Sequence, residues 1–249
     1  MLQEALKTMG FVFVAGGGRF GASVIRFFKE SGVKTLVVDV NANCSAREHV
    51  DFVAENLEGL DFSKGVNMII ADAVDVLIEL LSRGVIPEHI VPTMPGHFAG
   101  KILKNYLERK GFTITPSIPL LRGAFRKLPK DLAVLVDEIN SVIICSYMPF
   151  DKKCKTPCVQ PTVCPVTGRR KERAMFEILR EAAGAANIVC ILQSKLIAEN
   201  IGAFSGEELV KTLSECVRRS NYTIAIGTAC KCHGIINFFE VKRADSSQL

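Results

Sequence analysis

The sequence Phe11-Val-Phe-Val-Ala-Gly-Gly-Gly-Arg-Phe-Gly21 begins as a β-rich run and continues as a glycine-rich turn. Residues 22–30 then repeat apolar side chains at helical spacing. A second apolar run, residues 34–40, has Asp39 near its end. The order strand, glycine turn, helix and second strand is typical of the start of a parallel α/β sheet.

The residue types at this turn suit a dinucleotide. Gly16 permits a tight turn, Gly18 lets backbone amides approach a pyrophosphate, and Gly21 allows the helix to pack closely. The helix N-terminus adds partial positive charge toward the phosphates. A carboxylate at Asp39 would accept hydrogen bonds from the ribose hydroxyls and repel a 2′-phosphate, so we expect NAD rather than NADP.

Two further matches extend this pattern. The loop Gly16 to Gly21 with Leu36-Val-Val-Asp39, together with Ala71-Asp72-Ala73, resembles the nucleotide-binding domain of Trk-type potassium-uptake regulators and RCK domains. The resemblance covers residues 10–115, and potassium regulation is not carried over because the second half of the chain lies outside it. The resemblance implies a Rossmann domain, a homodimer, and a nucleotide contacted by Gly16, Gly18, Arg19, Gly21, Asp39 and Asp72.

A histidine follows one of the expected strands of this sheet. Residues 89–97 read as a strand that runs into a proline-rich turn, and residues 98–109 follow as a helix. Open parallel sheets bind ligands at the carboxyl ends of their strands. His97 is therefore a candidate catalytic residue, as a proton donor or substrate contact, and the alternative is that it caps the following helix.

The pattern loosens at residues 112–130 into a basic, proline-containing passage, so we place a domain boundary near residue 120. Beyond it, strands and helices are predicted at residues 132–136, 141–146, 172–183, 187–192, 206–218 and 222–228. The expected fold class is α/β, with a Rossmann-like parallel sheet in residues 1–120 and a second α/β portion in residues 121–249. The second portion carries a Cys-rich loop, and it either forms its own layer or continues the same sheet.

Cysteines and prolines dominate the segment Cys154-Lys-Thr-Pro-Cys158-Val-Gln-Pro-Thr-Val-Cys164-Pro165. Clustered thiols on a loop stiffened by proline suit a shared soft metal. A second group, Cys230-Lys-Cys232-His233, follows the last predicted strand and would complete a four-ligand site. The candidate metal ligands are Cys154, Cys158, Cys164, Cys230, Cys232 and His233. Cys145 and Cys190 lie singly on apolar strands and are expected in the core.

Three interpretations of these thiols stay open. Zinc sites pair their ligands as C-x2-4-C, which Cys154 and Cys158 satisfy. An iron–sulfur cluster takes cysteine thiolates, and the Cys164-Pro165 step is similar to the end of ferredoxin motifs, although the spacing of the cysteines differs from theirs. Without a metal, the neighbouring lysines and arginines would favour the thiolate form and reversible disulfides.

Composition places the chain among ordinary globular proteins, because 48% of its residues are hydrophobic and 23% are charged. No apolar run reaches the roughly 18 residues of a membrane span, and the N-terminus lacks the pattern of a secretory signal, so we expect the reducing cytoplasm. The excess behind the net charge of +5 is concentrated in residues 122–130 and 152–173, which indicates an anionic small molecule as a partner. Nucleic acid is disfavoured because 7% of residues are aromatic and Trp is absent.

These observations predict an NAD(P)-binding protein with a cysteine-ligated metal or iron–sulfur centre that acts as an oxidoreductase. The alternative is a non-catalytic regulatory module that senses NAD(H) and uses zinc to hold its second half together. A third interpretation rests on the likeness of the glycine-rich loop to precorrin dehydrogenases, which implies a dinucleotide-dependent step on a tetrapyrrole.

Overall fold

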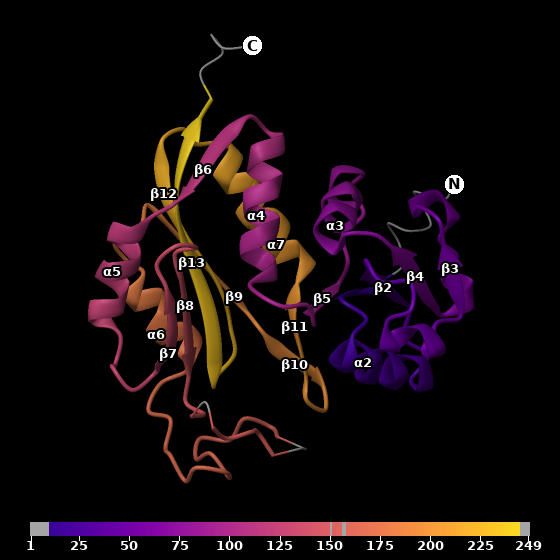
Figure 1. The fold of residues 1–249 in the computed structure, drawn as a ribbon, viewed down its shortest axis with the longest axis horizontal. Helices are drawn as coiled ribbons and strands as arrows, with labels where there is room; N and C mark the ends of the chain where they lie inside the picture. Colours follow the sequence, from indigo (N-terminus) through magenta and orange to yellow (C-terminus); the bar gives the residue numbers. More distant parts are fainter. Residues whose placement is uncertain (1–9, 150, 156–157, 245–249) are drawn as a thin grey trace. The chain divides into compact units, whose positions relative to one another are not determined.

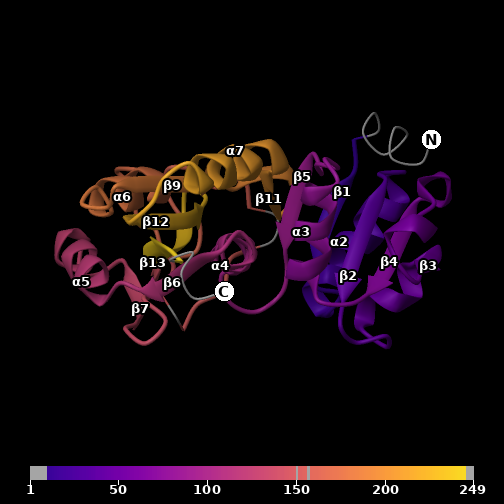
Figure 2. The same cartoon turned by 90° about the horizontal axis from the view of Figure 1, so that it is seen from above.

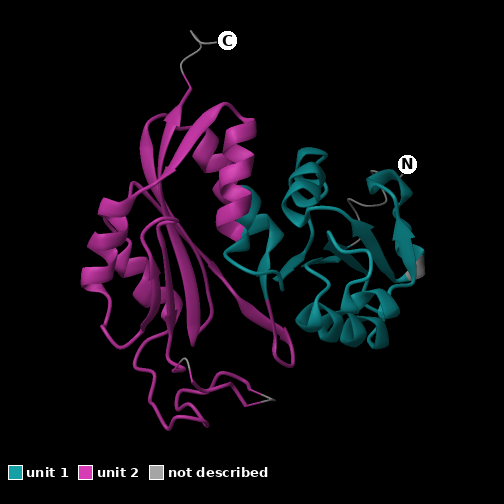
Figure 3. Ribbon diagram, in the orientation of Figure 1, with its two compact units in different colours: residues 1–98, 203–210 teal, residues 99–202, 211–249 magenta. Residues whose placement is uncertain are grey.

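The computed structural model describes residues 10–149, 151–155 and 158–244 (Figure 1). The chain divides into two compact units (Figure 3). Unit 1 comprises residues 1–98 and 203–210, and unit 2 comprises residues 99–202 and 211–249. Both units combine helices with β-strands, which confirms the predicted α/β class.

Unit 1 is built on a largely parallel sheet. Its strands are β1 (Val12–Ala15), β2 (Thr35–Asp39), β3 (Phe52–Ala54), β4 (Val66–Ile70), β5 (His89–Pro92) and β11 (Ile201–Ser205). The strand order is β11-β5-β1-β2-β4-β3, and β10 (Lys195–Ala198) pairs with β11 at the end of the row. The neighbours from β5 to β3 are parallel, whereas β11 runs antiparallel to β5. The predicted parallel character of the first sheet is therefore confirmed.

The glycine turn lies at a reversal of strand order. From β1 the chain passes through helix α2 (Arg19–Glu30) to β2, and it later returns to β5 on the other side of β1. α2 packs on the sheet through an apolar face that includes the buried Val24, Ile25 and Phe28. Open α/β sheets bind ligands outside the carboxyl ends of their strands at such a reversal.

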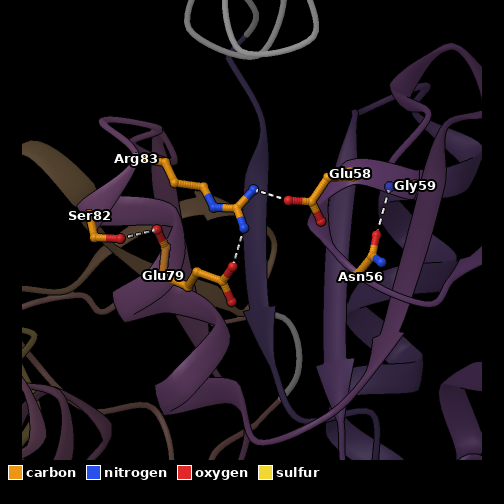
Figure 4. Close-up of polar contacts among 6 residues, drawn as sticks. All are labelled: Asn56, Glu58, Gly59, Glu79, Ser82 and Arg83. Carbon is orange, nitrogen blue, oxygen red and sulfur yellow. Dashed lines mark hydrogen bonds and ion pairs between the residues drawn. The ribbon is translucent and has the colours of Figure 1, made fainter.

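Helix α3 (Ala73–Ser82) ends in a charged contact (Figure 4). Arg83 follows the helix and forms ion pairs with Glu79, one turn earlier, and with Glu58 of the 3₁₀ helix η2 (Leu57–Gly59). Because both carboxylates are largely exposed, the contact ties two surface segments together but adds little to stability. The other 3₁₀ helices of unit 1 are η1 (Ser45–His49) and η3 (Phe62–Lys64).

Unit 2 is built on a second sheet that is mostly antiparallel. Its strands are β6 (Phe112–Pro116), β7 (Ala133–Asp137), β8 (Val142–Ser146), β9 (Ile188–Gln193), β12 (Tyr222–Ala229) and β13 (His233–Arg243). They follow the order β7-β8-β13-β12-β9, and β6 also pairs with β13. β9 and β12 run parallel, and the other pairs are antiparallel.

This second sheet is separate from the first one and does not continue it. The chain turns from β12 into β13 within three residues, and such a short connection allows only antiparallel pairing. β13, the longest strand of the sheet, was missing from the sequence-based prediction. From the second half of the chain, only β10 and β11 among the described strands extend the first sheet.

Residues 112–130, predicted as a passage between domains, contain β6 and helix α5 (Ile118–Lys127). The helix tolerates Pro119 because this residue lies in the first turn, where backbone N–H groups have no partner within the helix. β6 pairs with β13, so this passage is part of unit 2. The first segment of unit 1 ends at Phe98, ahead of this passage, and residues 203–210 return to unit 1.

Helices α5 and α6 (Met175–Ala182) lie side by side over one face of the second sheet (Figure 2). The core beneath them includes Ile143 of β8, Ala225 of β12 and Phe238 of β13. The remaining helices are α4 (Phe98–Arg109) and α7 (Gly206–Val217). Within the described ranges, no helix combines the length and the apolar character that a bilayer crossing requires.

Candidate functional site

In the glycine turn of unit 1, the structure requires glycine at positions 16 and 21 but leaves room for a side chain at position 18. Gly16 has a φ of +107°, a conformation that residues with side chains rarely adopt. A Cβ atom on Gly21 would lie 2.1 Å from the carbonyl oxygen of Gly16. Gly18 has a φ of −65°, and a Cβ atom there would meet no atom within 4 Å. Gly18 therefore borders open space at the N-terminus of α2.

Asp39 fixes the position of this turn. One of its carboxylate oxygens accepts a hydrogen bond from the N–H of Gly17 at 2.6 Å, and the other accepts one from the N–H of Asn41 at 2.8 Å. A ribose bound here would have to donate to carboxylate oxygens of Asp39 that already accept hydrogen bonds from these two backbone N–H groups. Arg19, the first residue of α2, is exposed beside the turn.

Asp72 lies at the same edge of the sheet, because it follows β4 and β4 pairs with β2. Its Oδ1 atom accepts hydrogen bonds from the N–H groups of Val74 at 2.7 Å and Asp75 at 3.3 Å. Asp72 is thus the N-cap of α3. The cap alone explains an acidic residue at this position, without a nucleotide.

His97, the candidate catalytic residue, is 6% exposed and interacts within the protein. Thr93, which the sequence analysis missed, contacts the glycine turn directly. Its hydroxyl lies 2.9 Å from the carbonyl oxygen of Ala15 and 2.6 Å from that of Gly16, within donating distance of both. The signal that could have identified Thr93 is its place directly after β5, at the carboxyl end of a strand next to β1.

In unit 2, Cys230 begins the tight turn between β12 and β13. Its N–H donates to the carbonyl oxygen of His233 at 2.9 Å, which closes the turn. Its sulfur accepts hydrogen bonds from the N–H groups of Cys232 and His233, both at 3.3 Å. Two backbone donors aimed at one sulfur favour its thiolate form. The pKa of Cys230 is well below its usual range, first because of the hydrogen bond with the Cys232 thiol and then, against the effect of burial, because of the His233 ring and these N–H groups.

A second turn presents Cys164 in a similar way. The N–H of Gly168, which has a φ of +69°, donates to the carbonyl oxygen of Cys164 at 2.8 Å. The Cys164 sulfur receives hydrogen bonds from the Thr167 hydroxyl and from the backbone of Thr167 and Val166, and the first of these is the main cause of a lowered pKa. Both turns therefore present a sulfur that is prepared to carry negative charge.

Backbone contacts hold the two cysteine segments together. The side-chain oxygen of Gln160 accepts a hydrogen bond from the N–H of Lys231 at 3.3 Å. The carbonyl oxygen of Cys232 accepts one from the N–H of Tyr147 at 2.9 Å. The end of β8, the Cys-rich loop and the β12–β13 turn are thus joined at one end of the second sheet.

The predicted ligands converge at this place. The His233 ring lies between two sulfurs, with Nε2 3.8 Å from the sulfur of Cys154 and Nδ1 3.8 Å from that of Cys230. Burial, followed by the charges of neighbouring cysteines, raises the pKa of Cys154. A cavity of about 20 Å³ lies among them, and its lining includes Cys154, Cys158, Cys164, Cys232 and His233. Within the described part of the chain, no three of these groups already form the geometry of a metal site.

Lys171, one of the basic residues expected near the thiols, also lines this cavity. It is 8% exposed. Burial of Cys154 and the hydrogen bond of Cys232 with Cys230 raise the pKa of these two thiols, and the Lys171 ammonium group partly opposes this rise. The same ammonium group adds to the lowering of the Cys164 pKa by Thr167. A buried cation offsets the negative charge that several thiolates would bring together. No sequence signal distinguishes Lys171 from the exposed lysines and arginines around it.

Two other cysteines are separate from this group. Cys145 lies in the hydrophobic core of unit 2, as predicted, and its burial raises its pKa to about 12. Cys190 is partly buried, with its sulfur 2.9 Å from the hydroxyl of Thr212.

Comparisons with known proteins match both halves of the chain. Two family models, described as the N-terminal and the C-terminal domain of an uncharacterized protein, match residues 11–98 and 114–242. A protein of Archaeoglobus fulgidus, described as an uncharacterized protein, is 30% identical over 231 residues, which cover 93% of this chain and 99% of the relative.

These matches correct the resemblance to Trk-type regulators and RCK domains, which was wrong. The N-terminal family domain covers residues 11–98, the region on which that resemblance rested, and the relative spans both units. A short glycine loop and two acidic residues occur at the same points of many α/β sheets, because turn geometry and helix capping select them. The Rossmann-domain assignment and the homodimer implied by that resemblance therefore lose their basis.

Proposed function

The chain belongs to the AF_1314 family, in which an N-terminal and a C-terminal domain are combined, and we propose that it binds a single thiophilic metal ion in unit 2 and a dinucleotide at unit 1. The observation that carries the proposal is the convergence of Cys154 and Cys164 with the Cys230 turn around one small cavity. In this proposal the protein is a regulatory module, and zinc is the metal.

The donor set fits zinc in its chemistry. Thiolate and imidazole are the ligands that zinc prefers, and sulfurs that accept backbone N–H groups are suited to bind it. Cys164 and Cys230 would supply the thiolates, and Cys154, Cys158, Cys232 and His233 offer the remaining donors. The cavity among these donors has room for one ion. A bound zinc ion would hold the Cys-rich loop against the second sheet.

Dinucleotide binding at unit 1 is supported by the space at Gly18. The helix α2 begins there without a side-chain cap, so its first N–H groups are not covered by the N-cap residue. A phosphate near these donors would also meet the partial positive charge of the helix end. Asp39 and the turn that it fixes would then contact the adenosine ribose, and NAD is expected to bind more tightly than NADP.

An oxidoreductase is the second candidate function, and the number of thiols favours it. A structural zinc ion needs four ligands, yet five cysteines and one histidine gather around the cavity and its turn. The additional thiols would serve an iron–sulfur centre or a reversible disulfide. The burial of His97 counts against a proton donor at this residue and so favours the regulatory module.

Anaerobic purification, followed by a visible spectrum and by iron, zinc and sulfide determination on the same sample, separates these candidates. Stoichiometric zinc without colour supports the regulatory module. Broad visible absorbance with stoichiometric iron and sulfide would replace zinc with a cluster and support electron transfer. Absence of all three would contradict a resident metal. Calorimetric titration with NAD, NADH and NADP tests unit 1 independently, and no saturable binding of any of them would contradict the dinucleotide proposal.

A further inference from the structure

A second cavity of about 280 Å³ lies in unit 2, beside the thiol cluster. It is lined by the end of α5, by Tyr147 after β8, by Arg169, Arg170, Glu172 and Arg173, and by α6. Tyr147 lines both this cavity and the one among the cysteines. The two basic stretches of the sequence, residues 122–130 and 152–173, therefore meet at one place through Lys127 and the arginines of the later stretch.

Positive side chains dominate the polar lining. Lys127, Arg169, Arg170 and Arg173 face the cavity together with two carboxylates, Glu172 and Glu181. The three arginines form ion pairs, in which Arg169 contacts Asp131 at 2.5 Å, Arg170 contacts Glu172 at 3.3 Å and Arg173 contacts Glu181 at 2.6 Å. The nearest contact in each pair is made by one guanidinium nitrogen. A guanidinium carries five N–H donors in a planar fork, so these arginines keep donors for a second oxyanion.

Tyr147 contacts the side chain of one of these arginines and the backbone of another. The guanidinium of Arg169 lies 5.0 Å from the centre of the Tyr147 ring, and the Tyr147 hydroxyl donates to the carbonyl oxygen of Arg173 at 2.8 Å. The ring therefore places the Arg169 guanidinium, and the hydroxyl fixes the backbone of Arg173, before any ligand arrives. Placing the Arg169 side chain in advance reduces the conformational entropy that this side chain would lose when an anion binds.

Another part of the lining is apolar. Leu132, Ile178 and Ala182 are buried residues of the hydrophobic core that also border this cavity. A ligand with an apolar body would pack against these side chains, a contact that inorganic phosphate cannot make. Ligand sites commonly combine an apolar wall with a few polar groups that fix orientation.

We propose that this cavity binds a small organic anion, with its carboxylate or phosphate group at Arg169, Arg170 and Arg173 and its apolar body against Leu132 and Ile178. The inference requires neither a metal nor a dinucleotide and so goes beyond the proposed function. Arg170 and Glu172 line this cavity, whereas Lys171 between them lines the thiol cavity, so a bound anion would lie next to the cysteines.

Isothermal titration of the full chain with phenyl phosphate and benzoate tests this proposal, and benzyl alcohol serves as the uncharged probe. We expect saturable binding of at least one anion and none of the alcohol. The anion that binds more tightly identifies phosphate or carboxylate as the recognised group. Each titration is made on protein of measured metal content, both before and after chelation, so that failure of the metal proposal and failure of this one are distinguishable.

Two variants locate the binding. The double substitution Arg170→Gln with Arg173→Gln should weaken anion binding by about tenfold or more, because charge-assisted hydrogen bonds are lost. Arg122→Gln is the matched control, since Arg122 lies on α5 and pairs with Glu138 outside the cavity lining. Absence of saturable anion binding, equal binding of benzyl alcohol, or an equal loss in Arg122→Gln would overturn the proposal. Unchanged thermal unfolding of each variant shows that the fold persists.

Discussion

The Cys154 sulfur lies 3.8 Å from Nε2 of His233, although the two residues are 79 positions apart in the sequence. The Nδ1 atom of the same ring lies 3.8 Å from the Cys230 sulfur. One imidazole thus connects the Cys-rich loop to the β12–β13 turn. Because the ring offers two nitrogens, a metal bound through one of them would leave the other to a thiol, and this arrangement orients the ring.

Replacement of a turn cysteine should remove the metal. Cys230→Ser or Cys164→Ser is expected to lower metal affinity by more than about tenfold. Loss of a residue that only hydrogen-bonds a metal ligand already lowers affinity by about tenfold or more, and loss of the ligand itself should cost at least as much. Metal content after dialysis against a weak chelator provides the measurement. Cys190→Ser is the matched control, since a serine hydroxyl retains the contact with Thr212. Equal metal content in all three variants would exclude the turn cysteines as ligands.

The core cysteines should resist alkylation. Burial raises the pKa of Cys145 and Cys216 to about 12, so at pH 8 only about one in ten thousand of these thiols is ionised. Cys154 is exposed and should react with iodoacetamide far faster in metal-free protein. Mass-spectrometric mapping of the modified peptides over time measures both rates. Raising the pH toward 10 should accelerate modification of Cys145 about tenfold per pH unit, and a rate independent of pH would contradict the assigned cause.

Substitutions at two glycines of the turn should separate stability from binding. Gly21→Ala places a Cβ against the Gly16 carbonyl oxygen and should destabilise unit 1 by about 1–3 kcal/mol. Gly18→Ser meets no neighbouring atom and introduces a favourable N-cap residue, so stability should change by less than about 1 kcal/mol. The same serine fills the space proposed for a pyrophosphate and should weaken NAD binding. Chemical unfolding and calorimetry measure the two effects, and unchanged NAD affinity in Gly18→Ser would place the nucleotide elsewhere.

Local patterns in the sequence were sufficient where neighbouring residues determine the structure. β1, α2 and β2 followed from continuous apolar runs, glycine placement and helical spacing, each of which acts within about ten residues. The convergence of the two cysteine groups was also predictable, because thiols clustered in two short segments are better explained by one shared site than by separate core positions. The identity of the nucleotide-contacting residues was less accessible, since the cap at Asp72 produces the same residue type.

Features that depend on distant partners could not be predicted. α5 was missed because Pro119 and the basic residues of this segment are typical of a linker. The helix is stabilised by packing of Leu121 and Ala124 into a core that includes residues of α6, and this packing is not visible in the local sequence. β13 was missed because its pairing with β6, β8 and β12 involves segments from across unit 2. Lys171 differs from the lysines and arginines around it in that its side chain is buried and lines the cavity among the cysteines, a placement that depends on the folded structure.

The two acidic residues at the sheet edge should respond differently to the same chemical change. Asp39 uses both carboxylate oxygens, one for Gly17 and one for Asn41, and an asparagine offers only one acceptor. Asp39→Asn should therefore destabilise unit 1 by about 1–3 kcal/mol, because one backbone N–H would face a second donor. Asp72 uses a single oxygen, Oδ1, for both of its N–H partners, and asparagine caps helices as well as aspartate does.

Asp72→Asn should accordingly leave the free energy of unfolding nearly unchanged, whereas Asp72→Ala should lower it by about 1 kcal/mol through loss of the cap. Urea unfolding of the full chain, with NAD absent, compares the four proteins under one condition. Because the two asparagine variants make the same change in charge, general electrostatics would affect them alike. Equal destabilisation of both would show that charge, and not the number of acceptors, governs this edge of the sheet.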